Sequence, residues 1–270
     1  MTRQESFQLQ GNAPQIYEQH KVPAIFRPLA ERTLQRVGVH EGARVIDIAC
    51  GTGIVARLAA EKVGKSGKVV GIDLNPGMIE VARQNSPLTG ANLEWHQGDA
   101  TALPFPEASF DFVFCQQGLQ FFPDKLAALE EMRRIMAPGS STILTIWSSI
   151  NPLAAAIADG LTRYVSAEAA TTSLAPYSFR DADLIKKLFE EAGYREIDME
   201  ILEVPRRIGP AEESIPREME GSTYWNGVVK LDRTKQEEMF QHIGEALRDF
   251  GVDGGLTIPQ QTHLIRASAS

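Results

Sequence analysis

The sequence predicts an α/β fold in which helices cover both faces of a mostly parallel sheet. From residue 44 onward, short apolar runs alternate with amphipathic helical stretches, and this order is typical of such a sheet. Hydrophobic residues make up 43% of the 270 residues and charged residues 23%, as in ordinary globular proteins. The length fits one large domain or one domain with an inserted lid.

Each predicted element follows from its own local pattern. Strands are expected at the apolar runs 44–49, 68–73, 93–97, 110–116 and 141–147, with later strands near 194–204 and 262–267. Helices are expected to begin near Gly53, Pro76 and Asp124. The third helix has its apolar residues on one face, and Pro138-Gly139 is expected to end it.

Two segments lie outside this alternation and divide the chain. We expect an N-terminal helical cap at residues 1–40, with its helix near 22–37. The cofactor-binding core is expected to cover residues 41–204, and residues 205–255 are expected to form a lid or substrate-side insertion. Residues 256–270 are expected to return to the core as its final strand.

The charge, the cysteines and the N-terminus exclude several functional classes. A formal net charge of −8 argues against a general nucleic-acid binder, because an acidic chain repels phosphate backbones. Cys50 and Cys115 are too few for a disulfide scaffold, and no cluster has metal-ligand spacing, so we expect no metal. The polar N-terminus lacks the apolar core of a signal peptide, and no window is apolar enough to cross a membrane. We therefore expect a cytoplasmic protein.

The segment Gly51-Thr52-Gly53 lies between the first apolar run and the first helical stretch. Glycine permits positive φ and lacks a Cβ, so the backbone can approach a ligand, and the helix N-terminus offers N–H groups. With Ala56 the turn matches the G-x-G-x-x-A dinucleotide pattern, which alone is a weak signal. Asp73 follows Gly53 by 20 positions, where a carboxylate can accept hydrogen bonds from ribose hydroxyls. Together they favour an adenosine-containing cofactor over a purely structural turn or a phosphate-binding P-loop.

Longer motifs distinguish nicotinamide cofactors from other adenosine compounds. Four segments resemble the five motifs of class I S-adenosylmethionine-dependent methyltransferases, and the third segment contains the third and fourth motifs. In chain order they are VIDIACGTG, VVGIDLNPGMIEVAR, WHQGDATALPFPEASFDFVFCQQGLQFFPD and ALEEMRRIMAPGSSTILTIW. The nearest subgroup includes the ubiquinone- and menaquinone-biosynthesis enzymes and many small-molecule methyltransferases. The resemblance is strong over residues 40–150. Ala49 departs from it, because many members have glycine there.

The resemblance implies a seven-stranded sheet with an antiparallel last strand. It also implies a site for S-adenosyl-L-methionine and its product S-adenosyl-L-homocysteine, in which Asp47 holds the ammonium, Asp73 binds the ribose and Asp99 accepts from the adenine amino group. The implied cofactor-binding residues are Tyr17, Asp47, Ala49, Gly51, Gly53, Asp73, Leu74, Met78, Asp99, Ala100, Gln116 and Phe121. Core packing by Met78 and Phe121, and an ordinary surface turn at Asp99, are the alternatives.

The resulting hypothesis is a methyltransferase that acts on an O, N or C atom of a small molecule, mainly by proximity and alignment. A general base is needed only if the acceptor loses a proton, and the candidates for catalysis are Tyr17, His20 and Gln117. Tyr224 and Trp225 are expected either to line an apolar acceptor pocket or to pack. The alternative functions are an NAD-dependent oxidoreductase and a non-catalytic adenosine-binding module. We expect no nucleic-acid partner, and either a monomer or a homodimer.

Overall fold

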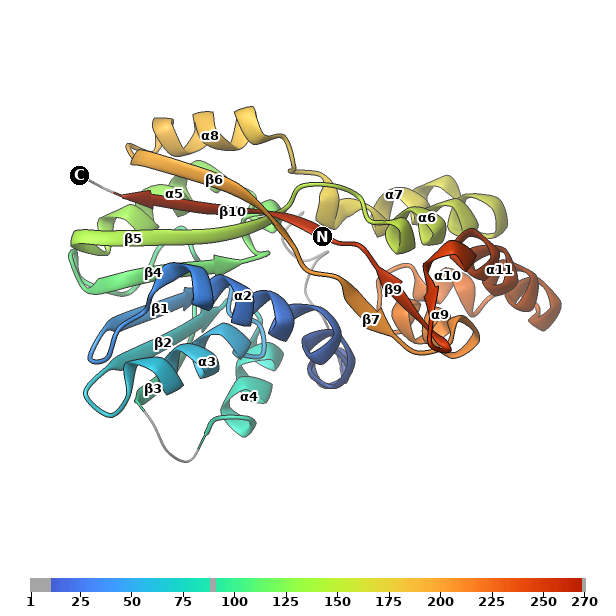
Figure 1. Ribbon diagram of the computed structural model, residues 1–270, viewed down its shortest axis with the longest axis horizontal. Coiled ribbons are helices and arrows are strands. Elements are labelled where there is room, and N and C mark those ends of the chain that lie inside the picture. Colours follow the sequence, from blue (N-terminus) through green and yellow to red (C-terminus); the bar gives the residue numbers. More distant parts are fainter. Residues whose placement is uncertain (1–10, 88–90, 269–270) are drawn as a thin grey trace. The chain divides into compact units, whose positions relative to one another are not determined.

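The computed structural model describes residues 11–87 and 91–268, and the chain divides into two compact units (Figure 1). The first unit comprises the chain up to Ile146, Phe179–Leu202 and the chain from Thr262 onward. The second comprises Trp147–Ser178 and Glu203–Gln261. Each unit has its own cluster of buried apolar side chains and therefore its own core.

The first unit is built on a seven-stranded sheet with the strand order β3-β2-β1-β4-β5-β10-β6. Its strands are β1 (Arg44–Ile48), β2 (Lys68–Asp73), β3 (Asn92–Gln97), β4 (Phe110–Gln116), β5 (Met136–Trp147), β6 (Arg195–Glu203) and β10 (Gln261–Ser268). Neighbouring strands from β3 to β5 are parallel, and the last strand, β10, runs antiparallel between β5 and β6 (Figure 1). The predicted fold class is confirmed.

Helices cover both faces of this sheet. They are α2 (Arg27–Val37), α3 (Ile54–Val63), α4 (Pro76–Gln84), α5 (Lys125–Arg134) and α8 (Ala182–Glu191). Helix α2 packs against α3 and α5 packs against α8, and Figure 1 shows the two pairs on opposite faces. The side chains of Asn75, Asp124 and Asp181 accept hydrogen bonds from first-turn N–H groups of α4, α5 and α8. Each of these helices therefore starts where a capping residue stands.

The end of α5 differs from the prediction that Pro138-Gly139 stops it. The helix ends at Arg134, and β5 begins at Met136 and continues through both residues. Gly139 has a φ of 75°, and the register of β4 against β5 shifts between Phe110 and Phe112. A local irregularity in the strand pair accommodates the proline and glycine that the prediction used as a helix stop.

The N-terminal cap begins earlier than the helix predicted near 22–37. It consists of α1 (Ala13–Ile16), a π-helix (Tyr17–Phe26) and α2 in direct succession. Pro23 lies inside the π-helix, where it has no N–H to donate. A π-helix does not repeat apolar residues at the α-helical spacing, so the periodicity that predicted the other helices was not available here.

The second unit combines helices with a small antiparallel sheet. The helices are α6 (Pro152–Tyr164), α7 (Ala167–Ser173), α9 (Ala211–Met219), α10 (Trp225–Val228) and α11 (Arg233–Ala246), and the strands are β7 (Arg206–Ile208), β8 (Gly251–Val252) and β9 (Gly255–Ile258). The strand order is β7-β9-β8. Leu161, Ile215 and Met239 are fully buried in the core of this unit. Residues 147–178 therefore pack with residues 203–261.

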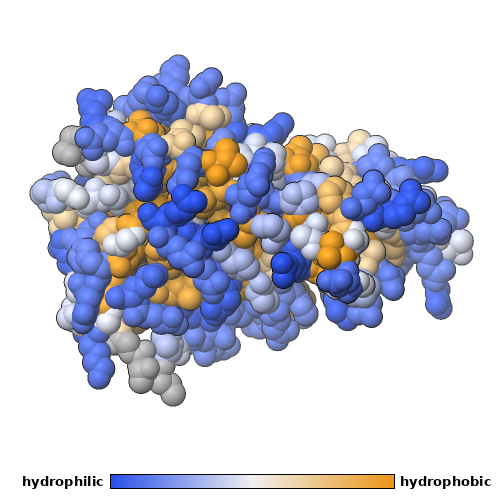
Figure 2. All heavy atoms as spheres, in the orientation of Figure 1, coloured by the Kyte–Doolittle hydropathy of each residue, from blue (hydrophilic) through white to orange (hydrophobic). Residues whose placement is uncertain are grey.

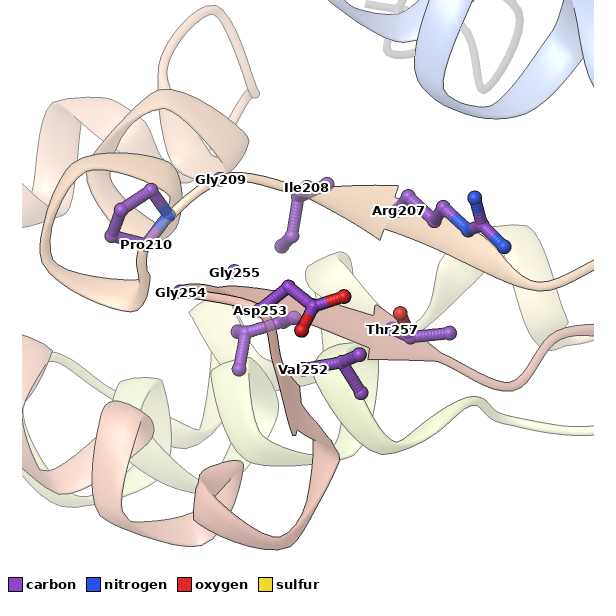
Figure 3. A pocket seen from close by; sticks show the side chains of 10 residues that line it. Arg207, Ile208, Gly209, Pro210, Val252, Asp253, Gly254, Gly255 and Thr257 are labelled. Carbon is purple, nitrogen blue, oxygen red and sulfur yellow. The ribbon is translucent and has the colours of Figure 1, made fainter.

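A hollow of about 450 Å³ lies at one end of the small sheet, between the loop after β7 and the turn from β8 to β9 (Figure 3). Of the residues that line it, only Arg207 and Asp253 are charged, and both are exposed. On the molecular surface, Figure 2 shows polar residues over most of one face with apolar residues between them. Among the described helices, none is long and apolar enough to cross a membrane.

Candidate functional site

The turn after β1 contains three residues in the left-handed region of backbone conformation. Gly51 and Gly53 have φ values of 57° and 89°, which glycine adopts without steric cost. Ala49 has a φ of 55°, which its Cβ makes unfavourable. The N–H of Cys50 donates to the carbonyl oxygen of Ile72 at 3.0 Å. The turn is thereby held against the end of β2.

Gly53 has a further reason to be glycine, which the sequence pattern does not show. A Cβ at Gly53, or at Gly71 on β2, would collide with the indole ring of Trp95 on β3. The Nε1 of Trp95 donates a 2.7 Å hydrogen bond to the Oγ of Ser86. Gly53 therefore allows an aromatic ring to pack against the turn, whatever ligand the turn binds.

Asp73 lies at the end of β2 and links the turn to α4. Its Oδ2 accepts a hydrogen bond from the Gly51 N–H and its Oδ1 accepts one from the Asn75 N–H, both at 2.8 Å. Burial raises the pKa of the Asp73 carboxyl, and these two hydrogen bonds oppose that rise. A carboxylate has about four lone-pair sites, so Asp73 retains capacity to accept from a ligand.

Asp47 on β1 is almost fully buried, with 1% of its surface exposed. Its Oδ2 accepts from the Ala56 N–H of α3 at 3.2 Å. Its Oδ1 is buried and has no hydrogen-bond partner within the described part of the chain. Burial raises the pKa of Asp47 to about 8, and the nearby carboxylate of Asp73 adds to the rise. The strand thus places an acidic group without a cation beside the glycine turn.

Tyr17, on the π-helix, lies over the glycine turn. A Cβ at Gly51 would be 3.7 Å from the Tyr17 ring and hydroxyl. The ring stacks on Phe26 with centroids 5.0 Å apart. Burial raises the pKa of the Tyr17 hydroxyl, and the negative charges of Asp73 and Asp47 raise it further. The hydroxyl is therefore a proton donor held near two carboxyl groups.

Two polar contacts tie the π-helix to the sheet. The Nη2 of Arg57 on α3 lies 2.7 Å from the Oε1 of Glu18, and the two side chains are 13% and 16% exposed. The Nε2 of Gln116, at the end of β4, donates to the carbonyl oxygen of Phe26 at 3.1 Å. Neither contact was predicted, because the partners are far apart in the sequence and pair only once the cap folds onto the sheet.

The residues predicted for the adenine end lie on the neighbouring segments. Met78 is buried in the first turn of α4 and Leu74 is half-buried before it. Asp99 follows β3, and its Oδ1 accepts hydrogen bonds from the N–H and the hydroxyl of Thr101, both at 2.9 Å. Ala100 packs against the core of the first unit. These contacts place Asp99 in a tight turn, at the same end of the sheet as Asp73.

The remaining side chains that the sequence suggested for the site differ from one another in burial and in contacts. His20 is exposed. Gln117 is buried, and its Nε2 donates to the Oγ1 of Thr262 at 2.9 Å. Phe121 is half-buried at the end of a short 3₁₀ helix. In the second unit, Tyr224 and Trp225 pack against the apolar core.

Several buried acceptor atoms lie on the glycine turn, on the neighbouring strands β1 and β4, and on the π-helix. Oxygens that have no hydrogen-bond partner among the described residues include Glu18 Oε2, Asp47 Oδ1, Thr52 Oγ1 and Gln116 Oε1. Native proteins leave few buried polar atoms unpaired, so a group of them calls for a ligand or water. Because these atoms are mostly acceptors, and two belong to carboxyl groups, they suit a ligand that is cationic and rich in donors.

The described residues support neither a cysteine nucleophile nor a metal site. Cys50 and Cys115 are free and buried, and burial raises the pKa of both thiols. A thiol with a high pKa is a poor nucleophile at neutral pH. In the described residues there is no group of three or more His, Cys, Asp or Glu side chains that could hold a metal ion.

Comparison with known proteins gives one family and a set of relatives. A family model described as a methyltransferase domain matches residues 45–139. A demethylmenaquinone methyltransferase of Staphylococcus aureus is 31% identical over 190 residues, which cover 66% of this chain and 76% of the relative. The family model spans the glycine turn, Asp73 and Asp99, which belong to the candidate site.

Solved structures share the fold at lower identity. The YcgJ protein of Bacillus subtilis has a TM-score of 0.56 at 19% identity, over 89% of this chain and 98% of that chain. Phosphoethanolamine N-methyltransferase 2 of Haemonchus contortus, in complex with S-adenosyl-L-methionine, has a TM-score of 0.54 at 18% identity, over 90% of this chain and 52% of that chain. At these identities the likeness concerns the fold.

Proposed function

The chain belongs to the class I S-adenosylmethionine-dependent methyltransferases, and we propose that it holds the cofactor across the glycine turn of the first unit. Its activity is the transfer of a methyl group from S-adenosylmethionine to a small molecule. The observation that carries the proposed site is the group of unpaired acceptor oxygens beside Asp47 and Gly51. An ammonium group and ribose hydroxyls supply the donors that these atoms lack.

We propose a role for each of the predicted site residues. Asp47 Oδ1 accepts from the cofactor ammonium, and Asp73 uses its remaining lone pairs for the ribose hydroxyls. Ala49, Gly51 and Gly53 keep the backbone of the turn close to the ligand. The adenine end of the cofactor is proposed to lie against Leu74, Met78, Asp99, Ala100 and Phe121. The Gln116 main chain completes the ammonium site, while its side chain holds the cap.

The bound cofactor supplies a methyl group on a positively charged sulfur, so the leaving group is already activated. The protein has to align the acceptor and exclude water. We assign the second task to Tyr17, because its ring lies over Gly51 and is braced by Phe26. We assign no general base, because His20 is exposed and the Gln117 amide does not titrate.

We propose a quinone-type ring compound as the acceptor. The relative with 31% identity is named for its action on demethylmenaquinone, and its match reaches well beyond the residues of the glycine turn. Residues 205–255 are proposed to adapt the enzyme to its acceptor, as the sequence predicts for this segment. The two free thiols also favour a reducing compartment, and we propose the cytoplasm.

Calorimetric titration with S-adenosylhomocysteine and with NAD tests the proposed site. We expect the wild type to bind S-adenosylhomocysteine and not NAD. Asp73→Asn should weaken that binding by about 1.5–3 kcal/mol, because charged hydrogen bonds to the ribose are lost. Asp253→Asn is the matched control, since Asp253 is exposed in the second unit and has a left-handed φ that asparagine tolerates. Tight NAD binding, or an unchanged affinity in Asp73→Asn, would contradict the proposal.

A further inference from the structure

A chain of buried hydrogen bonds leads from the sheet to Gln120. The Oγ1 of Thr262 on β10 donates to the carbonyl oxygen of Ile146 on β5 at 2.8 Å. The Nε2 of Gln117 donates to Thr262 Oγ1 at 2.9 Å. The Nε2 of Gln120 in turn donates to the Oε1 of Gln117 at 3.0 Å. The side chains in this chain are buried.

This chain fixes the direction of every hydrogen bond in it. A carbonyl oxygen can only accept, so the single hydroxyl hydrogen of Thr262 is committed to Ile146, or to the carbonyl oxygen of His263 at 3.3 Å. Thr262 Oγ1 must then accept from the amide nitrogen of Gln117, which turns the Gln117 amide oxygen toward Gln120. Gln120 therefore presents its nitrogen to Gln117 and keeps its oxygen on the other side.

The amide oxygen of Gln120 has no partner of its own. Gln120 is 5% exposed, and its Oε1 is buried with no hydrogen-bond partner in the described part of the chain. An unsatisfied buried acceptor is costly, and rotating the amide would cost more, because the donor to Gln117 would be lost. The protein thus maintains a fixed, unpaired acceptor at this position.

Gln120 belongs to a segment that lies against the glycine turn. The chain from Gln117 to Gln120 directly follows β4, and a Cβ at Gly118 would lie 2.7 Å from the Cβ of Ala49. Gln117 itself has a φ of 54°, a conformation that non-glycine residues rarely adopt and that is common at functional sites. The fixed acceptor is therefore on the segment next to the turn that we assign to the cofactor.

We propose that Gln120 Oε1 accepts a hydrogen bond from an O–H or N–H of the methyl acceptor. The ring compound proposed above as the methyl acceptor then carries a hydrogen-bond donor, such as the hydroxyl of a hydroquinone or a phenol. Gln117 and Thr262 are positioning residues, because the Gln117 amide and the Thr262 hydroxyl orient Gln120. The inference rests on the proposed methyltransferase function and specifies the chemistry of its acceptor.

The test uses the full-length protein saturated with S-adenosylhomocysteine. The probes are 1,4-dihydroxynaphthalene, which has two hydroxyl donors, and 1,4-dimethoxynaphthalene, which has none. We expect the dihydroxy probe to bind the wild-type complex about tenfold or more tightly than the dimethoxy probe. Gln120→Met keeps the length of the side chain without the acceptor and should remove this preference, while the affinity for S-adenosylhomocysteine stays within about twofold.

The relay, meaning the hydrogen bonds that join Thr262, Gln117 and Gln120, offers a matched pair of variants. Thr262→Val removes the hydroxyl that orients Gln117 and should reduce the preference for the dihydroxy probe, whereas Thr262→Ser keeps the hydroxyl and should preserve it. A purely structural role of the relay would lower the melting temperature in Thr262→Val without changing the ratio of the two affinities.

Three outcomes would overturn the inference. They are equal binding of the two probes to the wild type, failure of the dihydroxy probe to bind the complex, and an equal preference in Gln120→Met. If Gln120→Met instead weakens the binding of S-adenosylhomocysteine, Gln120 contacts the cofactor and the inference is also wrong. Failure of the wild type to bind S-adenosylhomocysteine would count against the proposed function. The experiment therefore distinguishes a failure of the proposed function from a failure of the inference about Gln120.

Discussion

The two units differ in how each surrounds one deeply buried charged side chain. In the second unit, Arg206 of β7 pairs with Glu218 of α9, and the side chains are only 6% and 10% exposed. Another of its buried polar contacts is made by the amide nitrogen of Asn151, which donates to the Tyr177 hydroxyl at 2.7 Å. In the first unit, Asp47 and Gln120 keep buried oxygens without partners in the described chain.

The difference separates polar groups that support the fold from polar groups that await a ligand. A buried ion pair keeps opposite charges together inside the fold, so removing one partner costs stability. Unpaired acceptors lower stability, and a fold that retains several of them at one end of a sheet gains from a ligand that fills them. The predictions below test this contrast.

The largest effect is expected from breaking the ion pair of the second unit. Arg206→Met breaks the buried ion pair with Glu218, and we expect the free energy of unfolding to fall by about 3–5 kcal/mol. The exposed pair of Arg217 and Glu213 on α9 provides the control. Arg217→Met should change the free energy of unfolding by less than about 0.5 kcal/mol. Chemical denaturation measures both. A small loss in Arg206→Met would show that the buried pair does not hold this unit.

Asp47 should make the unliganded protein less stable as the pH rises. Its pKa is 3.8 as an ordinary carboxyl and about 8 in the fold, so between these values the folded state holds a proton that the unfolded chain has lost. The contribution of this group to the free energy of unfolding is therefore greatest below about pH 4. It falls between about pH 4 and pH 8 and is lost above about pH 8.

The neutral variant Asp47→Asn isolates this contribution from all other titrating groups. The difference in unfolding free energy between the wild type and Asp47→Asn should change by about 5 kcal/mol from pH 4 to pH 8, in the direction that favours the variant at high pH. Denaturation at a series of pH values measures it. A difference that does not depend on pH would mean that Asp47 is already compensated in the unliganded fold.

The smallest effect concerns the backbone of the glycine turn. Ala49→Gly should stabilise the protein by about 1 kcal/mol, because glycine adopts the left-handed φ without strain. Ala108→Gly is the matched control, since Ala108 has the same φ of 55° away from the turn and should give a similar gain. Thermal denaturation measures both. A loss of stability in Ala49→Gly alone would show that the Ala49 methyl group packs against Gly118 to greater benefit than the strain it causes.

The strand–helix alternation and the start of a helix near Asp124 could be predicted, because each depends on neighbours within a few positions. The spacing of Gly51 and Asp73 was also local enough to indicate an adenosine cofactor. The packing of Trp95 on Gly53 was not, because it joins residues on different elements. The same holds for Arg57 with Glu18 and for Gln117 with Thr262, which are 39 and 145 positions apart. Contacts of this kind follow from the topology and have no sequence pattern.

The central claim is that the unpaired acidic site beside the glycine turn receives the cationic end of the cofactor. Calorimetry of S-adenosylhomocysteine binding at pH 7, in two buffers of different ionisation enthalpy, tests it by counting protons. Asp47 is mostly protonated before binding and must ionise to pair with an ammonium group, so the wild type should release about one proton and Asp47→Asn none. Equal proton release in the two proteins, or equal affinity, would contradict the claim.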